Sequence, residues 1–189
     1  MRVAGLLCTG FLGMLGACSS DSESSITSNA QTPPTSGRAD IEAWLTDASY
    51  KTWACEPAVH AARDPSPHGF NRICSNDLIA GSATGTGAWP KGAAAVKELY
   101  ASLTATTPFG YAVYLKTSSD SASGANWYWY ERVPLTSDAP HDANGTVADG
   151  KGGGGTPLTI CVDCHRAAGS DAGHTPSPGG RDQVYTPVH

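Results

Sequence analysis

Two stretches in the middle of the chain alternate in the way that a β-strand requires. They cover residues 111–116 (YAVYLK) and 127–133 (WYWYERV), and in each the residues at odd and even positions form separate sets. A period of two is typical of a strand with one face toward a core. A run at 93–100 follows the turn signal at 89–92 (WPKG), and residues 68–76 are also compatible with a strand. These segments predict a small antiparallel sheet.

Helical spacing occurs nearer the N-terminus. Apolar side chains at Ile41, Trp44, Leu45 and Ala48 fit one face of a helix within residues 39–53. Residues 138–156 are rich in Gly and Asp and are predicted to form a loop. The predicted fold class is therefore α+β, a mainly antiparallel sheet with a few helices. A net charge of −5 offers no basic surface for nucleic acid.

The first 17 residues read as an export signal. Arg2 precedes an apolar run, and small residues lead to Cys18, as in a bacterial lipobox. We expect residues 1–17 to be a lipoprotein signal peptide and Cys18 to carry the lipid; an ordinary cleavage site is the alternative. Ser19 favours the outer membrane, facing the periplasm. Residues 18–37 are polar and predict a flexible tether, which leaves 38–189 as the folded domain.

The sequence Cys161-Val162-Asp163-Cys164-His165 has the C-x-x-C-H pattern of c-type haem attachment. Two thiols on one turn can add to the two vinyl groups of one porphyrin, and the following imidazole can bind the iron. A redox C-x-x-C usually accompanies a βαβ pattern, and a zinc site needs two further ligands. We therefore predict one covalent haem c, held by Cys161, Cys164 and His165.

Two other cysteines, Cys55 and Cys74, lie in the same domain. Export places them in an oxidising compartment, which favours a disulfide between them over two free thiols. In the chain-entropy model such a bridge contributes roughly 3 kcal/mol.

The second axial ligand of the iron is open at this stage. Both methionines, Met1 and Met14, precede Cys18, so a distal methionine is excluded in the exported chain. The remaining alternatives are a vacant position and a second histidine. The histidine candidates are His60, His68, His141, His174 and His189.

Several segments, in order, resemble the cytochrome P-460 family, which includes the cytochrome c′-beta proteins. The segments are 89–100, the strand that opens at Gly110-Tyr111, the aromatic stretch 127–131, the C-x-x-C-H motif, and 182–186. The resemblance covers roughly residues 66–187. It implies an antiparallel β fold with added helices, often dimeric, and a five-coordinate haem with His165 proximal.

The resemblance also implies roles for three further residues. Lys97 matches the lysine that is cross-linked to the haem in the hydroxylamine-oxidising members, and otherwise would be a solvated lysine. Arg72 matches a family arginine, with a surface cation as the alternative. Asp120 is the acidic residue nearest in sequence to the position of the family's distal carboxylate. The alternative interpretation is that Asp120 is a solvated loop residue. These three are the expected catalytic residues.

Three functions follow as expectations. The first is oxidation of hydroxylamine or a related nitrogen compound, with electrons passed to an exported partner. The second is binding of nitric oxide or carbon monoxide, as in the c′-beta proteins. The third is electron transfer by a haem with two histidine ligands, through His60 or His68. Membrane contact is expected through the lipid anchor only.

Overall fold

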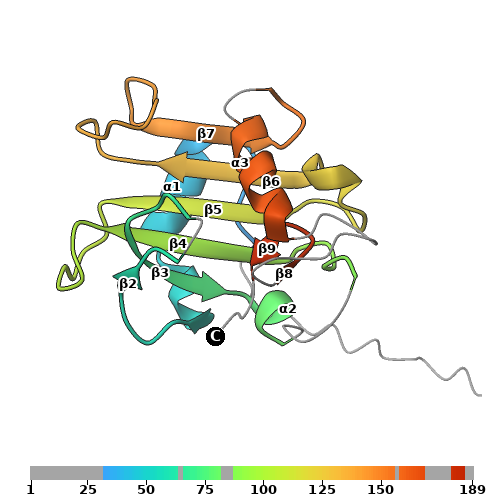
Figure 1. The fold of residues 1–189 in the computed structure, drawn as a ribbon, viewed down its shortest axis with the longest axis horizontal. Helices are drawn as coiled ribbons and strands as arrows, with labels where there is room; N and C mark the ends of the chain where they lie inside the picture. Colours follow the sequence, from blue (N-terminus) through green and yellow to red (C-terminus); the bar gives the residue numbers. More distant parts are fainter. Residues whose placement is uncertain (1–31, 64–65, 82–86, 156–157, 169–179, 186–189) are drawn as a thin grey trace, which may run out of the picture.

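A seven-stranded antiparallel sheet forms the centre of the structure, a computed structural model that describes residues 32–63, 66–81, 87–155, 158–168 and 180–185 (Figure 1). The strand order is β1-β3-β4-β5-β6-β7, and β2 also pairs with β3. The strands are β1 (Ala54–Cys55), β2 (His60–Ala61), β3 (Phe70–Ser75), β4 (Ala94–Tyr100), β5 (Gly110–Lys116), β6 (Trp127–Arg132) and β7 (Thr146–Lys151). The α+β class predicted from the sequence is confirmed.

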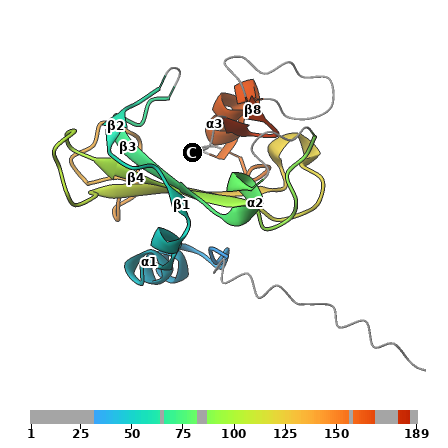
Figure 2. The same cartoon turned by 90° about the horizontal axis from the view of Figure 1, so that it is seen from below.

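The two faces of the sheet are covered by different layers. Helix α1 (Arg38–Thr46) and the 3-10 helix η1 (Ser49–Thr52) cover one face (Figure 2). The other face carries α3 (Leu158–His165) and the hairpin of β8 (Gly180–Arg181) and β9 (Val184–Tyr185). Three short helices complete the fold: α2 (Asp77–Ala80), η2 (Ala122–Gly124) and η3 (Arg166–Ala168).

Each layer has its own apolar core. On the α1 side, Ile41, Trp44 and Leu45 pack against the sheet. On the α3 side, Leu158 and Val162 pack against Trp127 and Trp129. Strand β6 contributes to both cores, and its four residues 127–130 are all buried. Both faces of this antiparallel strand are therefore covered, whereas the alternation suggested one covered face.

Cys55 lies directly opposite Cys74 in the β1–β3 pair, and the two form the expected disulfide. The bridge fastens the edge strand β1 to β3. It also joins the segment after α1 to the sheet that α1 covers.

Two local predictions are corrected. The predicted helix stops at Thr46, and Ala48 has a left-handed φ of 54°, so η1 follows as a separate element. The predicted loop 138–156 contains β7, an edge strand that pairs with β6. Its Asp, Gly and Lys residues are uncommon in strands. As an edge strand, β7 is hydrogen-bonded on one side only, to β6, where such residues are tolerated.

Some expectations fall outside the described residues: the signal segment 1–17, Cys18, the tether as far as residue 31, and two histidines, His174 and His189. Within the described ranges, no helix combines the length and apolar character needed to cross a membrane.

Candidate functional site

A cavity of about 520 Å³ lies between the sheet and α3. This volume is within the range of small-molecule sites, roughly 300–1,000 Å³. Strands β4, β5 and β6, the segment before β3, and α3 contribute to its walls. Most lining side chains are aliphatic or aromatic. Its acidic, basic and thiol-bearing members are His68, Lys97, Glu131, Cys161, Cys164 and His165.

Helix α3 brings the C-x-x-C-H motif to this cavity. Leu158 and Val162 are one turn apart and buried against the sheet, which fixes the rotation of the helix. Cys161 and Cys164 then lie beside this apolar face, half-buried and lining the cavity. Burial raises the pKa of the Cys161 thiol to about 12, so the group is protonated at neutral pH. Cys161 is therefore held as a neutral thiol, and both cysteines line the same wall of the cavity.

His165, at the end of α3, has a defined tautomer. Its Nδ1 lies 2.7 Å from the backbone carbonyl oxygen of Gln183. Because a carbonyl only accepts, Nδ1 carries the hydrogen and Nε2 keeps its lone pair. Burial lowers the pKa of His165 to about 3, so the ring is neutral. A neutral imidazole with its second nitrogen hydrogen-bonded is the form in which histidine binds metals.

Aromatic rings surround His165 on several sides. The ring centroid of Trp129 is 4.6 Å away, and those of Tyr114 and Tyr185 are each 5.7 Å away. The Tyr185 hydroxyl donates to the carbonyl of Cys164 at 2.8 Å. These contacts hold the imidazole and the preceding backbone in one orientation.

Lys97 enters the same cavity from the middle of β4. Its Nζ is 3.4 Å from the Ser66 hydroxyl. Burial lowers the pKa of Lys97 to about 8, against the opposing effect of the nearby Glu131 carboxylate. A larger fraction of the amine is therefore neutral near pH 7 than for an exposed lysine, and a neutral amine is a nucleophile.

Glu131 is a cavity residue that the sequence reasoning missed. It follows Trp127 and Trp129 on the same face of β6, so the alternation itself was the signal. Its Oε1 lies 3.3 Å from Nδ1 of His68, and both side chains are mostly buried. The structure thus pairs a carboxylate with an imidazole in the cavity that contains Lys97 and His165.

Arg72 is not part of this group, which corrects the expectation of a catalytic role. In the β3–β4 register it lies opposite Glu98, not Lys97, and its Nε donates to Glu98 Oε2 at 2.8 Å. Glu98 also accepts from the hydroxyls of Tyr50 and Tyr100, both at 2.7 Å. Since Lys97 and Glu98 alternate along β4, Arg72 belongs to the α1 face of the sheet.

Asp120 is likewise placed away from the cavity. It is exposed in the loop after β5, and its Oδ1 accepts from Asn126 Nδ2 at 2.8 Å. Of the other histidine candidates, His60 contacts Glu56 at 2.8 Å and His141 contacts the Asp142 carbonyl oxygen at 2.8 Å. Neither is a cavity residue, so His68 is the described histidine that shares the cavity with His165.

Within the described residues, no three His, Cys, Asp or Glu side chains converge as a metal site. The cavity instead combines a neutral imidazole, two cysteines, the half-buried amine of Lys97 and a carboxylate–imidazole pair. No protein-family model, curated protein or solved structure matches this chain.

Proposed function

We propose that the cavity holds one covalent haem c and that the protein oxidises hydroxylamine or a related small nitrogen compound. The observation that carries the proposal is the position of His165. Its Nδ1–H is committed to the Gln183 carbonyl, and Cys161, Cys164 and Lys97 line the same cavity. This combination supports the function that the resemblance to the cytochrome P-460 family implies.

The residues present fit a haem. Cys161 and Cys164 supply two thiols from one turn of α3, and His165 supplies a neutral imidazole with a free Nε2 lone pair. The lining is largely apolar, which suits the largely apolar surface of a porphyrin ring. The cavity volume is also in the range of cofactor sites. When bound, the haem would supply a redox-active iron to which electrons from the substrate could pass.

Lys97 is the residue that we propose for the covalent cross-link. Its half-buried amine lies in the cavity with Cys164 and His165, and its lowered pKa favours the nucleophilic form. Asp120 and Arg72 drop out of the proposed chemistry because they lie elsewhere.

The Glu131–His68 pair is suited to accept protons. Oxidation of hydroxylamine removes electrons and protons together, and a carboxylate in contact with an imidazole can take a proton inside an apolar cavity. The electrons would leave to an exported electron-transfer partner.

We further propose that the domain is exported and lipid-anchored through Cys18, at the outer membrane and facing the periplasm. The Cys55–Cys74 disulfide supports an oxidising compartment. The tether 18–37 would separate the haem domain from the lipid.

The test is to produce the chain in a host that exports it and matures c-type cytochromes, and then to record its spectrum after dithionite reduction. We expect covalent haem in a denaturing gel and a Soret band strongly red-shifted from ordinary c-type haem. Cys161→Ser with Cys164→Ser should lose the covalent haem, whereas Lys151→Met, at an exposed lysine, should retain both features. A purified protein without haem would overturn the proposal.

Two alternative functions have specific support in the cavity. Leu99 and Phe109 give part of it an apolar wall suited to a diatomic gas. An ordinary five-coordinate ferrous spectrum with rapid carbon monoxide binding would establish that alternative.

The second alternative is an electron carrier in which His68 is the sixth ligand of the iron. A sharp low-spin spectrum that His68→Ala abolishes would establish this function instead.

A further inference from the structure

The partner of His165 Nδ1 is a backbone carbonyl, so its position depends on the turn that contains it. Gln183 lies with Asp182 between β8 and β9, and β8 pairs with β9 as Arg181 opposite Val184. Both central residues have positive φ, 47° at Asp182 and 72° at Gln183. A two-residue turn of this kind normally uses Asn or Gly, so this one needs support from outside the hairpin.

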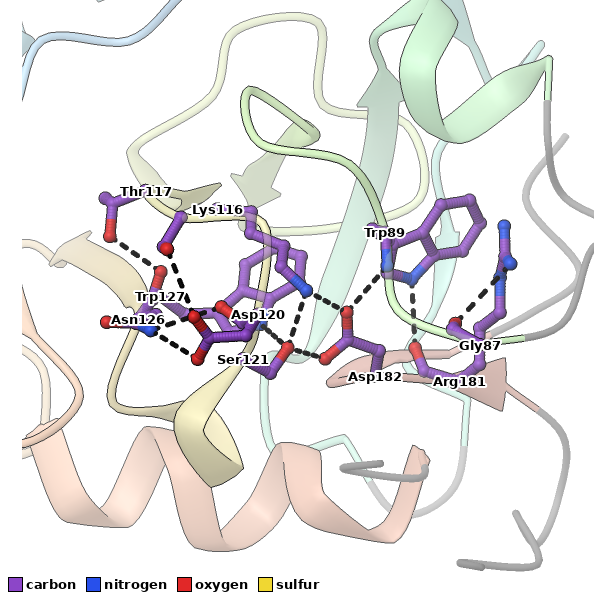
Figure 3. A network of polar contacts seen from close by, with 11 residues as sticks. Gly87, Trp89, Lys116, Thr117, Asp120, Ser121, Asn126, Trp127, Arg181 and Asp182 are labelled. Carbon is purple, nitrogen blue, oxygen red and sulfur yellow. Dashed lines mark hydrogen bonds and ion pairs between the residues drawn. The ribbon is translucent and has the colours of Figure 1, made fainter. Parts of the chain in front are cut away.

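That support comes from a buried polar network around Asp182 (Figure 3). The carboxylate accepts from the backbone N–H of Trp89 at 2.7 Å, from the Ser121 hydroxyl and from Lys116 Nζ. Lys116, the last residue of β5, is 0 % exposed, and Asp182 is 2 % exposed. The turn is therefore attached directly to the central sheet through a buried ion pair.

Neighbouring contacts hold the same hairpin. The indole N–H of Trp89 donates to the Arg181 carbonyl at 2.9 Å, and the Arg181 guanidinium lies 3.6 Å from the Trp89 ring centroid. Lys116 Nζ also donates to Ser121 Oγ at 2.6 Å and lies 5.5 Å from the centroid of a Trp127 ring. The network thus connects β5, the segment before β4, and the C-terminal hairpin.

A continuous connection therefore runs from β5 to the imidazole. It passes from Lys116 to Asp182, along the peptide to the Gln183 carbonyl, and to His165 Nδ1. The hydrogen bond to the outer nitrogen of a histidine ligand sets its orientation and basicity. We infer that Lys116 and Asp182 are positioning residues that tune the iron through His165, an inference that rests on the proposed function.

The physical consequence concerns the redox equilibrium. A well-aligned Nδ1–H···O=C hydrogen bond makes the imidazole a stronger donor and favours the ferric state. If the Lys116–Asp182 ion pair is lost, the Gln183 carbonyl moves and its hydrogen bond to His165 weakens. The ferrous state then becomes more stable relative to the ferric state. A tenfold change in the ferric–ferrous equilibrium constant corresponds to about 59 mV for one electron.

The experiment compares the holoprotein with Asp182→Asn and with the double variant Lys116→Met/Asp182→Asn, which leaves no unpaired buried charge. In both, covalent haem content and the far-UV circular dichroism should be unchanged. The ferric–ferrous midpoint potential should rise by about 59 mV, a tenfold change in the equilibrium constant. The iron–histidine stretch of the five-coordinate ferrous protein should move to lower frequency. Asp47→Asn, at an exposed position by the end of α1, is the matched control and should change neither signal.

The outcomes separate the two proposals. Wild-type protein without haem would overturn the proposed function and this inference together. Haem-containing variants with an unchanged potential and stretch would overturn the inference alone. Failure of both variants to fold would also overturn it, because the ion pair would then serve the fold as a whole.

Discussion

Lys97 and Glu98 are consecutive residues of β4, and their side chains lie on opposite faces of the sheet. Lys97 lines the cavity beneath α3, whereas Glu98 accepts hydrogen bonds from Tyr50 and Tyr100 on the α1 side. The alternation of side chains along β4 therefore separates two faces of the sheet. Lys97 belongs to the face that lines the cavity, and Glu98 belongs to the face covered by α1.

Lys97→Met should separate haem attachment from haem modification. Under the proposed function, attachment depends on Cys161 and Cys164, so the variant should retain covalent haem, and its ferrous Soret band should return to that of ordinary c-type haem. Absorption spectra of the reduced proteins provide the measurement. If the Soret band of Lys97→Met matched that of wild type, the cross-link would have to be abandoned.

Glu131→Gln should reduce turnover without changing the haem. The amide preserves the shape of the side chain but is a poor proton acceptor, so hydroxylamine oxidation should fall by about 10²–10⁴. Haem content and the ferrous spectrum should be those of wild type. Turnover is followed with an artificial electron acceptor, and Asp47→Asn provides a matched control on the other face. Undiminished turnover in Glu131→Gln would remove this residue from the mechanism.

Arg72→Leu should affect stability and not turnover. The substitution leaves Glu98, which is 0 % exposed, without its guanidinium partner. Breaking such a pair costs about 3 kcal/mol in the free energy of unfolding. Urea unfolding followed by tryptophan fluorescence measures the loss, and turnover per folded haem should match wild type. A catalytic defect with normal stability would contradict the placement of Arg72.

Glu98→Gln should flatten the acid side of the stability curve. Burial alone would raise the pKa of Glu98, but hydrogen bonds from Tyr100, Tyr50 and Arg72 outweigh it and lower the value. A carboxyl with a lowered folded-state pKa adds stability above its unfolded value of about 4.3, and loses it as the pH falls through the folded-state pKa. The variant should therefore be less stable than wild type at pH 7, and the difference should shrink toward pH 3. A constant difference in urea midpoints across this range would show that Glu98 does not titrate as described.

Replacing Cys55 and Cys74 together by alanine should lower the free energy of unfolding by about 3 kcal/mol. The bridge closes a loop of intermediate length, so its main effect is on the unfolded chain. Denaturant unfolding of the oxidised wild type and of the variant gives the difference. Equal stabilities would mean that the β1–β3 pairing holds without the bridge.

Much of the central fold was predictable because it depends on local pattern. The alternation at 111–116 and 127–133 identified β5 and β6, and the turn signal at 89–92 preceded β4. Cys55 and Cys74 paired as expected. Strand β7 was missed because an edge strand tolerates Asp, Gly and Lys, so its sequence resembles a loop.

Local spacing alone accounts for the α3 wall of the cavity, because Cys161, Cys164 and His165 belong to one short helical segment. The residues that face this wall are set by tertiary packing. The β3–β4 register placed Arg72 against Glu98, and β6 brought Glu131 to His68. The buried Lys116–Asp182 pair fixed the turn that holds His165. Strand register and the docking of distant segments arise from packing between residues far apart in the chain. Local periodicity therefore does not predict them.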